Sequence, residues 1–159
     1  MPDWMKQAMD NNELGELKKA NAAKDQIIAQ LKIRQESPEF WKQLLEKLAL
    51  QVAFLHEAFG LDGSMNTSDS ANGEILCSID ISWHTASPRT MYVNLFYRPG
   101  GSVIRYWPQF GEPADLPFGV VKDELVLFVK PQYFNSEQAA TQFVRDMVRI
   151  VKPDALQRT

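Results

Sequence analysis

Three residues whose types could form a nucleophilic site lie close together on one predicted strand. Asp80, Ser82 and His84 alternate with apolar residues near the end of the segment from Ile75 to His84. A carboxylate, a hydroxyl and an imidazole are the parts of a nucleophile, its base and the group that orients the base. Neighbouring side chains on one face of a strand lie roughly 6.5–7 Å apart and point the same way, so these three cannot converge as a triad requires. No Gly-x-Ser-x-Gly turn is present, and we expect a protein without catalytic activity.

Metal and cofactor sites are not predicted either. The two histidines, His56 and His84, and the single cysteine are too few for a zinc site without carboxylate ligands. The polar segment that begins at Asp62 resembles a calcium-binding loop, but Thr67 stands where such a loop needs glycine, and Gly73 where it needs glutamate. No glycine-rich phosphate loop opens a helix, so we expect no cofactor.

The segment from Glu74 to Trp107 predicts the centre of the fold. Apolar and polar residues alternate strictly from Ile75 to His84 and again from Met91 to Arg98, which is the period of half-buried strands. Pairing His84 with Thr90 brings the apolar residues of both strands to one face, whereas a slip of one residue would separate them. The two strands therefore form an antiparallel hairpin.

Two further hairpins extend the predicted sheet. Gly100 and Gly101 follow a proline and suit a tight two-residue turn, because glycine accepts positive φ angles. Phe118 to Val121, a turn at Lys122-Asp123, and Glu124 to Lys130 form the last hairpin. We therefore predict five antiparallel strands in meander order.

Segments with helical periodicity precede and follow the predicted strands in the sequence. Ser37 and Pro38 predict the start of a second helix, because serine caps helices and proline suits the first helical position. This helix is expected to end at Gly60. A C-terminal helix from about Ser136 to Lys152, stopped by Pro153, packs on the sheet. The predicted fold class is α+β, with two N-terminal helices, a five-stranded antiparallel meander sheet and a C-terminal helix.

Residues 1–36 are predicted to be a helical N-terminal extension, residues 37–153 an α+β domain and residues 154–159 a tail. The extension carries a heptad seam whose apolar and polar positions are Leu14, Leu17, Asn21, Lys24, Ile28 and Leu31. Polar residues at seam positions typically set register and oligomeric state. Three arrangements are open: a dimerising coiled coil, a helix folded back on its own domain, and a frayed arm. We expect self-association through the N-terminal helices.

Composition and charge exclude several classes of partner. The 159 residues are 45% hydrophobic and carry a net charge of −3 without a basic stripe, so a nucleic-acid partner is not expected. A single cysteine, Cys77, excludes an internal disulfide and fits a reducing compartment. No signal segment or long apolar run is present, so we expect a cytoplasmic protein without membrane contact.

One face of the predicted sheet carries the residues that we expect to bind a partner or ligand. They are Asp80, His84, Tyr92, Asn94, Phe96, Arg98, Arg105 and Trp107. In the predicted register Asp80 lies opposite Asn94, and Phe96 lies opposite Arg105. Aromatic and arginine side chains are enriched where proteins bind one another. A helix of the same chain could instead cover this face.

The sequence thus favours a non-catalytic binding or adaptor protein that recognises a protein or peptide segment through this face. The loop from Pro108 to Pro117, stiffened by three prolines, could contribute to the same site. The alternative is a small-molecule binding or sensing domain with a pocket between helices and sheet.

The predicted order of elements resembles that of type III secretion chaperones, small proteins that dimerise and bind extended polypeptide. This resemblance concerns the fold alone, with no shared motif. It implies a dimeric, chaperone-like adaptor.

Overall fold

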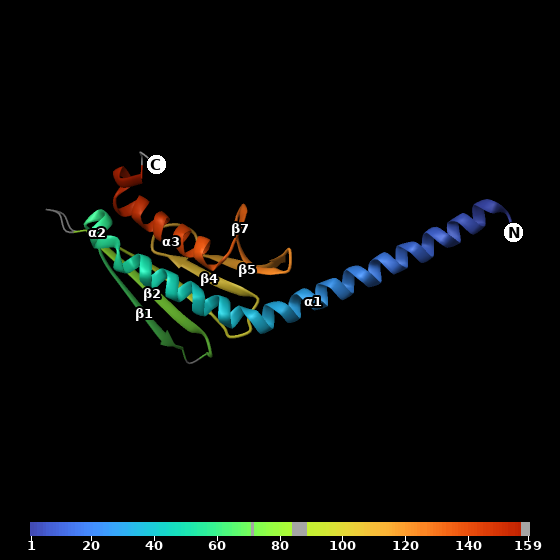
Figure 1. Ribbon diagram of the computed structural model, residues 1–159, viewed down its shortest axis with the longest axis horizontal. Coiled ribbons are helices and arrows are strands. Elements are labelled where there is room, and N and C mark those ends of the chain that lie inside the picture. Colours follow the sequence, from blue (N-terminus) through green and yellow to red (C-terminus); the bar gives the residue numbers. More distant parts are fainter. Residues whose placement is uncertain (71, 84–88, 157–159) are drawn as a thin grey trace.

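The computed structural model describes residues 1–70, 72–83 and 89–156 of the chain. A very long helix, an antiparallel sheet and a C-terminal helix make up the fold (Figure 1). In chain order the elements are α1 (Asp3–Ala53), α2 (Leu55–Phe59), β1 (Asp62–Asp69), β2 (Ile75–Trp83), β3 (Arg89–Tyr97), β4 (Val103–Pro108), β5 (Ala114–Val121), β6 (Glu124–Val129), β7 (Gln132–Phe134), α3 (Ser136–Val151) and the short 3-10 helix η1 (Pro153–Leu156). The α+β class and the antiparallel sheet are as expected.

Among the described residues the sheet has seven strands in the order β1 to β7, so the prediction of five strands is wrong. The prediction missed β1 because its sequence is polar and turn-rich, and because most of its residues are exposed on both faces. It also missed the three-residue strand β7. The meander order itself is as expected, since every strand pairs with its neighbours along the chain.

Helix α1 is continuous over 51 residues, so the prediction of two N-terminal helices is also wrong. Pro38 lies inside the helix, where its ring removes one backbone donor and commonly bends the axis. Figure 1 shows the helix changing direction where it leaves the domain. Although α1 is long, none of the helices in the described part of the chain is long and apolar enough to cross a membrane.

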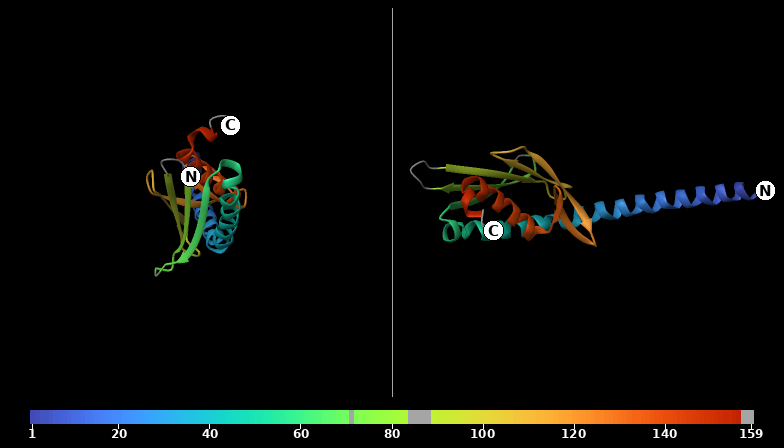
Figure 2. Two further views of the ribbon diagram at one scale, coloured as in Figure 1. Left: turned by 90° about the vertical axis from the view of Figure 1, so that its left-hand side faces the viewer. Right: turned by 90° about the horizontal axis from the view of Figure 1, so that it is seen from above.

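The N-terminal part of α1 projects away from the rest of the molecule (Figures 1 and 2). We call residues 3–32 the arm. The side chains of this segment are almost all exposed, so it is not folded back on its own domain. The second half of α1 is different, because it buries a stripe that consists of Phe40, Trp41, Leu44, Leu48 and Val52.

Both long helices pack on the same face of the sheet, as the end-on view in Figure 2 shows. The sheet presents a buried stripe to them that consists of Cys77, Ile79, Ile81, Met91, Val93, Leu95, Tyr97 and Ile104. Residue alternation correctly assigned all of these to the core face, because side chains on a strand point to opposite faces in turn. The hydrophobic core lies between the helices and this face.

The pairing of β2 with β3 differs from the prediction by two residues. Ile81 lies opposite Met91 and Ser82 opposite Thr90, whereas we predicted His84 opposite Thr90. An offset of two keeps every side chain on its predicted face, so alternation cannot detect it. Between β3 and β4 the predicted register is confirmed, with Phe96 opposite Arg105.

Two predicted chain reversals are confirmed, and a capping box opens α3. Gly60 follows α2 with a left-handed φ of 68°, which glycine adopts without steric cost. Lys122 and Asp123 both have positive φ in the turn between β5 and β6. Asn135 caps α3, accepting a hydrogen bond from the backbone of Gln138, while the Gln138 side chain accepts one from the backbone of Asn135.

Candidate functional site

The candidate site is the face of the sheet turned away from the helices, which we call the outer face. Its central strand is β3, which contributes Tyr92, Asn94 and Phe96. On the β2 side their direct neighbours are Asp80, Ser78 and Leu76, in that order. On the β4 side Asn94 neighbours Trp107, and Phe96 neighbours Arg105. Regular strands on a packed core therefore hold these side chains in fixed positions.

Two predicted aromatic residues of this face are exposed. Tyr92 is 38% exposed and Trp107 is 47% exposed, while Phe96 is half-buried between its neighbours on β2 and β4. The helices lie on the opposite face and the arm leads away from the sheet (Figure 2). The described part of the chain therefore leaves these aromatic side chains uncovered. Within one copy, this excludes the arrangement in which a helix covers the face.

The start of the β4–β5 loop is fastened to the edge of this aromatic surface. The backbone N–H of Gln109 donates to the carbonyl of Tyr92 at 3.0 Å, and the Gln109 side-chain oxygen accepts from the backbone N–H of Tyr92 at 3.1 Å. The next residue is Phe110, whose side chain is 53% exposed. The predicted site residues do not include Phe110, although the predicted proline-rich loop contains it.

That loop is shorter than predicted. Pro108 ends β4, and the residues from Ala114 onward belong to β5, whose Ala114 pairs with Tyr106. Only five residues, 109–113, connect the two strands. Prolines suggested a loop because they cannot donate a ladder hydrogen bond, but Pro117 is accommodated within a strand.

Both arginines of the predicted site lie near carboxylates, but they lie in different parts of the sheet. Arg105 lies on the outer face with its Nε 3.6 Å from a carboxylate oxygen of Asp115 on β5. Arg98 follows β3, donates to the carbonyl of Asn72 at 3.2 Å and lies 3.9 Å from Glu74. The structure therefore brings Arg105 to the aromatic surface, whereas Arg98 holds the corner of the sheet near the β1–β2 turn.

The structure does not bring Asp80 and Ser82 together as a nucleophilic site. Asp80 and Ser82 are half-buried neighbours along β2, and His84 lies outside the described residues. Burial raises the pKa of the Cys77 thiol to about 12, which keeps it protonated and unreactive at neutral pH. Within residues 1–70, 72–83 and 89–156, no group of three or more metal-ligating side chains could hold a metal ion.

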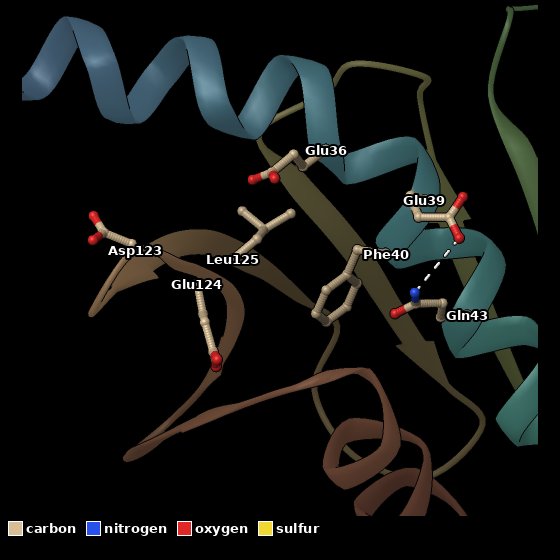
Figure 3. A pocket seen from close by; sticks show the side chains of 7 residues that line it. All are labelled: Glu36, Glu39, Phe40, Gln43, Asp123, Glu124 and Leu125. Atoms are coloured by element: carbon tan, nitrogen blue, oxygen red, sulfur yellow. Dashed lines mark hydrogen bonds between the residues drawn. The ribbon is translucent and has the colours of Figure 1, made fainter.

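An acidic surface pocket of about 320 Å³ lies elsewhere, between α1 and the β5–β6 turn. Its seven lining residues, shown in Figure 3, are Glu36, Glu39, Phe40, Gln43, Asp123, Glu124 and Leu125. The four carboxylates point in different directions and do not converge on one position (Figure 3). Gln43 donates to Glu39 at 3.5 Å within the same helix. These residues therefore form a solvated acidic surface.

Comparison with known proteins gives no match: no protein-family model, no curated protein and no solved structure is similar to this chain.

Proposed function

We propose that the chain is a non-catalytic binding or adaptor protein of the cytoplasm that recognises a segment of another protein through the outer face of its sheet. The observation that carries this proposal is the exposure of Tyr92 and Trp107 on a face that no helix in the described part of the chain covers. Large aromatic side chains gain much from burial at an interface and lose little conformational entropy there. A rigid surface of this kind is ready to bind without rearrangement.

The chemistry of the surface favours a polypeptide partner. Aromatic rings alternate with groups that donate or accept hydrogen bonds, namely Asp80, Asn94 and Arg105. A polypeptide offers both apolar side chains and backbone amides to such a mixture. The Arg105 guanidinium lies 3.6 Å from a carboxylate oxygen of Asp115, and this pairing reduces the attraction of its charge for an anionic polymer.

The small-molecule alternative has weaker support because large side chains fill the centre of the layer between helices and sheet, and a cavity of about 460 Å³ is left at its edge, between α1 and β1. Trp41 of α1 stacks on Tyr97 of β3 with 5.1 Å between ring centroids. Tyr106 of β4 stacks on Phe143 of α3 at 5.5 Å. Phe118 packs edge-on against Phe40, with 5.2 Å between the rings. A ligand in the centre of this layer would have to displace stacked rings.

Selection from a displayed library of random peptides tests the proposal directly. Peptides that bind the wild-type protein are measured again on Trp107→Ala and Tyr92→Ala. We expect at least about a ten-fold loss of affinity on both variants, which is the range of interface hot spots. Thermal unfolding should stay close to wild type, because both side chains are half-exposed.

Tyr133→Ala is the matched control. Tyr133 is 56% exposed and packs on Phe128 at 5.0 Å, on the β6–β7 hairpin and away from β3. Its loss should leave peptide affinity unchanged. Peptides whose affinity falls with Tyr133→Ala but not with Trp107→Ala would overturn the assignment of binding to the region of Tyr92 and Trp107.

A further inference from the structure

The arm presents an apolar seam to solvent. Four of its side chains are about half-exposed: Leu14 at 52%, Leu17 at 57%, Ile28 at 54% and Leu31 at 49%. The arm projects from the domain (Figure 1), and of these four residues only Leu31 lies near another element, the β3–β4 turn. A row of large apolar side chains on a solvent-exposed helix commonly marks an interaction surface.

The seam borders the chain's own domain only at its C-terminal end, where Leu31 lines a groove with Gly100 and Ser102. Ile33 is half-buried against the core, whereas Leu31, two residues earlier, is exposed. Residues two positions apart lie on nearly opposite sides of an α-helix. A second helix can therefore lie along the seam without displacing the domain.

The spacing of the seam selects a second copy of the same arm in antiparallel orientation. The seam positions, a and d of successive heptads, are Leu14, Leu17, Asn21, Lys24, Ile28 and Leu31. In an antiparallel pair each a residue meets a d residue of the other helix. One register then matches every layer, and its pairs are Leu14 with the partner's Leu31, Leu17 with the partner's Ile28, and Asn21 with the partner's Lys24.

Other registers and the parallel orientation fit worse. A parallel dimer would place Lys24 against the partner's Lys24 and bury two like charges in the seam. An antiparallel pair shifted by one heptad would set Ile28 against the partner's Asp10, or against the partner's Lys24 when shifted the other way. Only the matched register places the polar residues Asn21 and Lys24 opposite each other across the seam. Polar pairs at seam positions typically fix the register of the two helices.

The flanking charges support the same register. Beside the seam, an antiparallel pair brings Lys18 next to the partner's Asp25 and Glu13 next to the partner's Arg34. By symmetry each pair occurs twice, and all four contacts are attractive. In a parallel dimer Glu13 would meet the partner's Lys18, but Asp25 would meet an alanine, Ala20.

A groove at the base of the arm continues the apolar seam. This groove of about 450 Å³ lies between α1 and the β3–β4 turn and is lined by Ile27, Gln30, Leu31, Ile33, Arg34, Gly100 and Ser102. In the matched register the partner's Leu14 lies against Leu31, at the edge of this groove. The partner's arm would therefore cover apolar surface beyond the seam itself.

We propose that two copies of the chain associate through their arms as an antiparallel two-stranded coiled coil, in the register that pairs Leu14 with the partner's Leu31. The two domains then lie at opposite ends of the paired arms, so that their outer faces stay accessible. This proposal rests on the arm alone and stands independently of the function proposed for the sheet.

Charge exchange on the full-length chain tests the orientation. Lys18→Glu faces the partner's Asp25 in the antiparallel pair, and Glu13 of the partner in a parallel one. We expect Lys18→Glu to raise the dimer dissociation constant about ten-fold at low salt, as for a repulsive flanking pair present twice. Adding Asp25→Lys should restore dimerisation, and adding Glu13→Lys should not. Sedimentation equilibrium measures each variant, and rescue by Glu13→Lys alone would overturn the antiparallel assignment.

A second pair of variants tests the seam. Ile28→Glu places a charge in an apolar layer and should convert the dimer to a monomer of the 18.1 kDa chain mass. Ala22→Glu adds the same charge to the same exposed arm on the side away from the seam, and should leave the dimer intact. A wild-type chain that stays monomeric at about 100 μM, well above the range of specific dimers, would refute the proposal.

Spin labels measure the orientation as a distance. A label on Asn12→Cys lies about 32 Å along the axis from its copy in the antiparallel pair, since the two sites are separated by about 21 residues of 1.5 Å rise. In a parallel dimer the axial separation is zero. The natural Cys77 is fully buried and should stay unlabelled. A short inter-label distance in double electron–electron resonance would contradict the proposal.

Discussion

Ser37 of α1 and Tyr97 at the end of β3 share a buried hydrogen bond, with 2.6 Å between their hydroxyl oxygens. The same Tyr97 oxygen accepts the backbone N–H of Gly100 at 2.9 Å. One phenol therefore connects the long helix, the central strand and the β3–β4 turn. Ser37, which the sequence suggested as a helix cap, is instead a fully buried contact in mid-helix.

Removal of the Tyr97 hydroxyl should destabilise the domain more than removal of the Ser37 hydroxyl. Tyr97→Phe leaves both Ser37 and the Gly100 N–H without this partner, and we expect a loss of about 1–3 kcal/mol in the free energy of unfolding. Ser37→Ala leaves the Gly100 bond intact, so about 1 kcal/mol is expected. Urea titrations of both variants measure the difference, and the reverse order would contradict this account.

The orientation of α1 predicts different losses of stability for substitutions at two leucines that are two positions apart in the sequence. Leu48 is fully buried, whereas Leu50 is 54% exposed. Leu48→Ala should cost about 2–5 kcal/mol, the range for a buried leucine whose removal leaves a cavity. Leu50→Ala should change stability by about 0.5 kcal/mol or less. Equal effects in chemical denaturation would show that the helix packs with another face.

Strand β1 passes so close to α1 and α2 that a side chain at position 63 would push its neighbours aside. A Cβ atom there would lie 2.8 Å from a methyl group of Val52 and 2.9 Å from one of Leu55. Gly63→Ala should therefore destabilise the protein by about 1–3 kcal/mol through overpacking. Ser64→Ala, at the next and exposed position, is the control and should be nearly neutral. Thermal unfolding distinguishes the two.

The buried thiol predicts a loss of stability in alkali. Burial raises the pKa of Cys77 from 9.0 to about 12. Between these values the unfolded chain releases the thiol proton while the folded chain keeps it, so stability falls as pH rises above 9. By pH 10.5 the loss amounts to about 2 kcal/mol. Cys77→Ala should remove this part of the fall in the free energy of unfolding between pH 8 and 10.5. If the free energy of unfolding of the variant falls as steeply as that of the wild type, the thiol is not the cause.

Sequence periodicity was informative wherever one face of an element is buried. Alternation identified the core faces of β2, β3 and β4 because each has an apolar side and a polar side. It could not fix the offset between β2 and β3, since any even shift preserves the faces. It also could not identify β1, in which only Met65 is half-buried and the remaining residues are exposed.

Local signals misled where packing at longer range decided the structure. Ser37 and Pro38 are typical of a helix start, yet α1 continues through them because Phe40 and Leu44 anchor the following turns in the core. The aromatic residues Tyr92 and Trp107 were correctly placed on the outer face. Their accessibility could not be predicted, because it depends on where the helices and the arm lie in space.

The strictly sequential order of the sheet has a consequence for how the chain reaches this structure. Each strand pairs with its neighbour along the chain, so every step of sheet formation closes only a short loop, which favours rapid assembly. The contact of α1 with α3 is different, because the hydrogen bond between Gln51 and Thr141 spans 90 residues. During synthesis the contact between α1 and α3 must therefore wait for nearly the whole chain to emerge. We expect α3 to dock last, as the step that commits the domain to its native state.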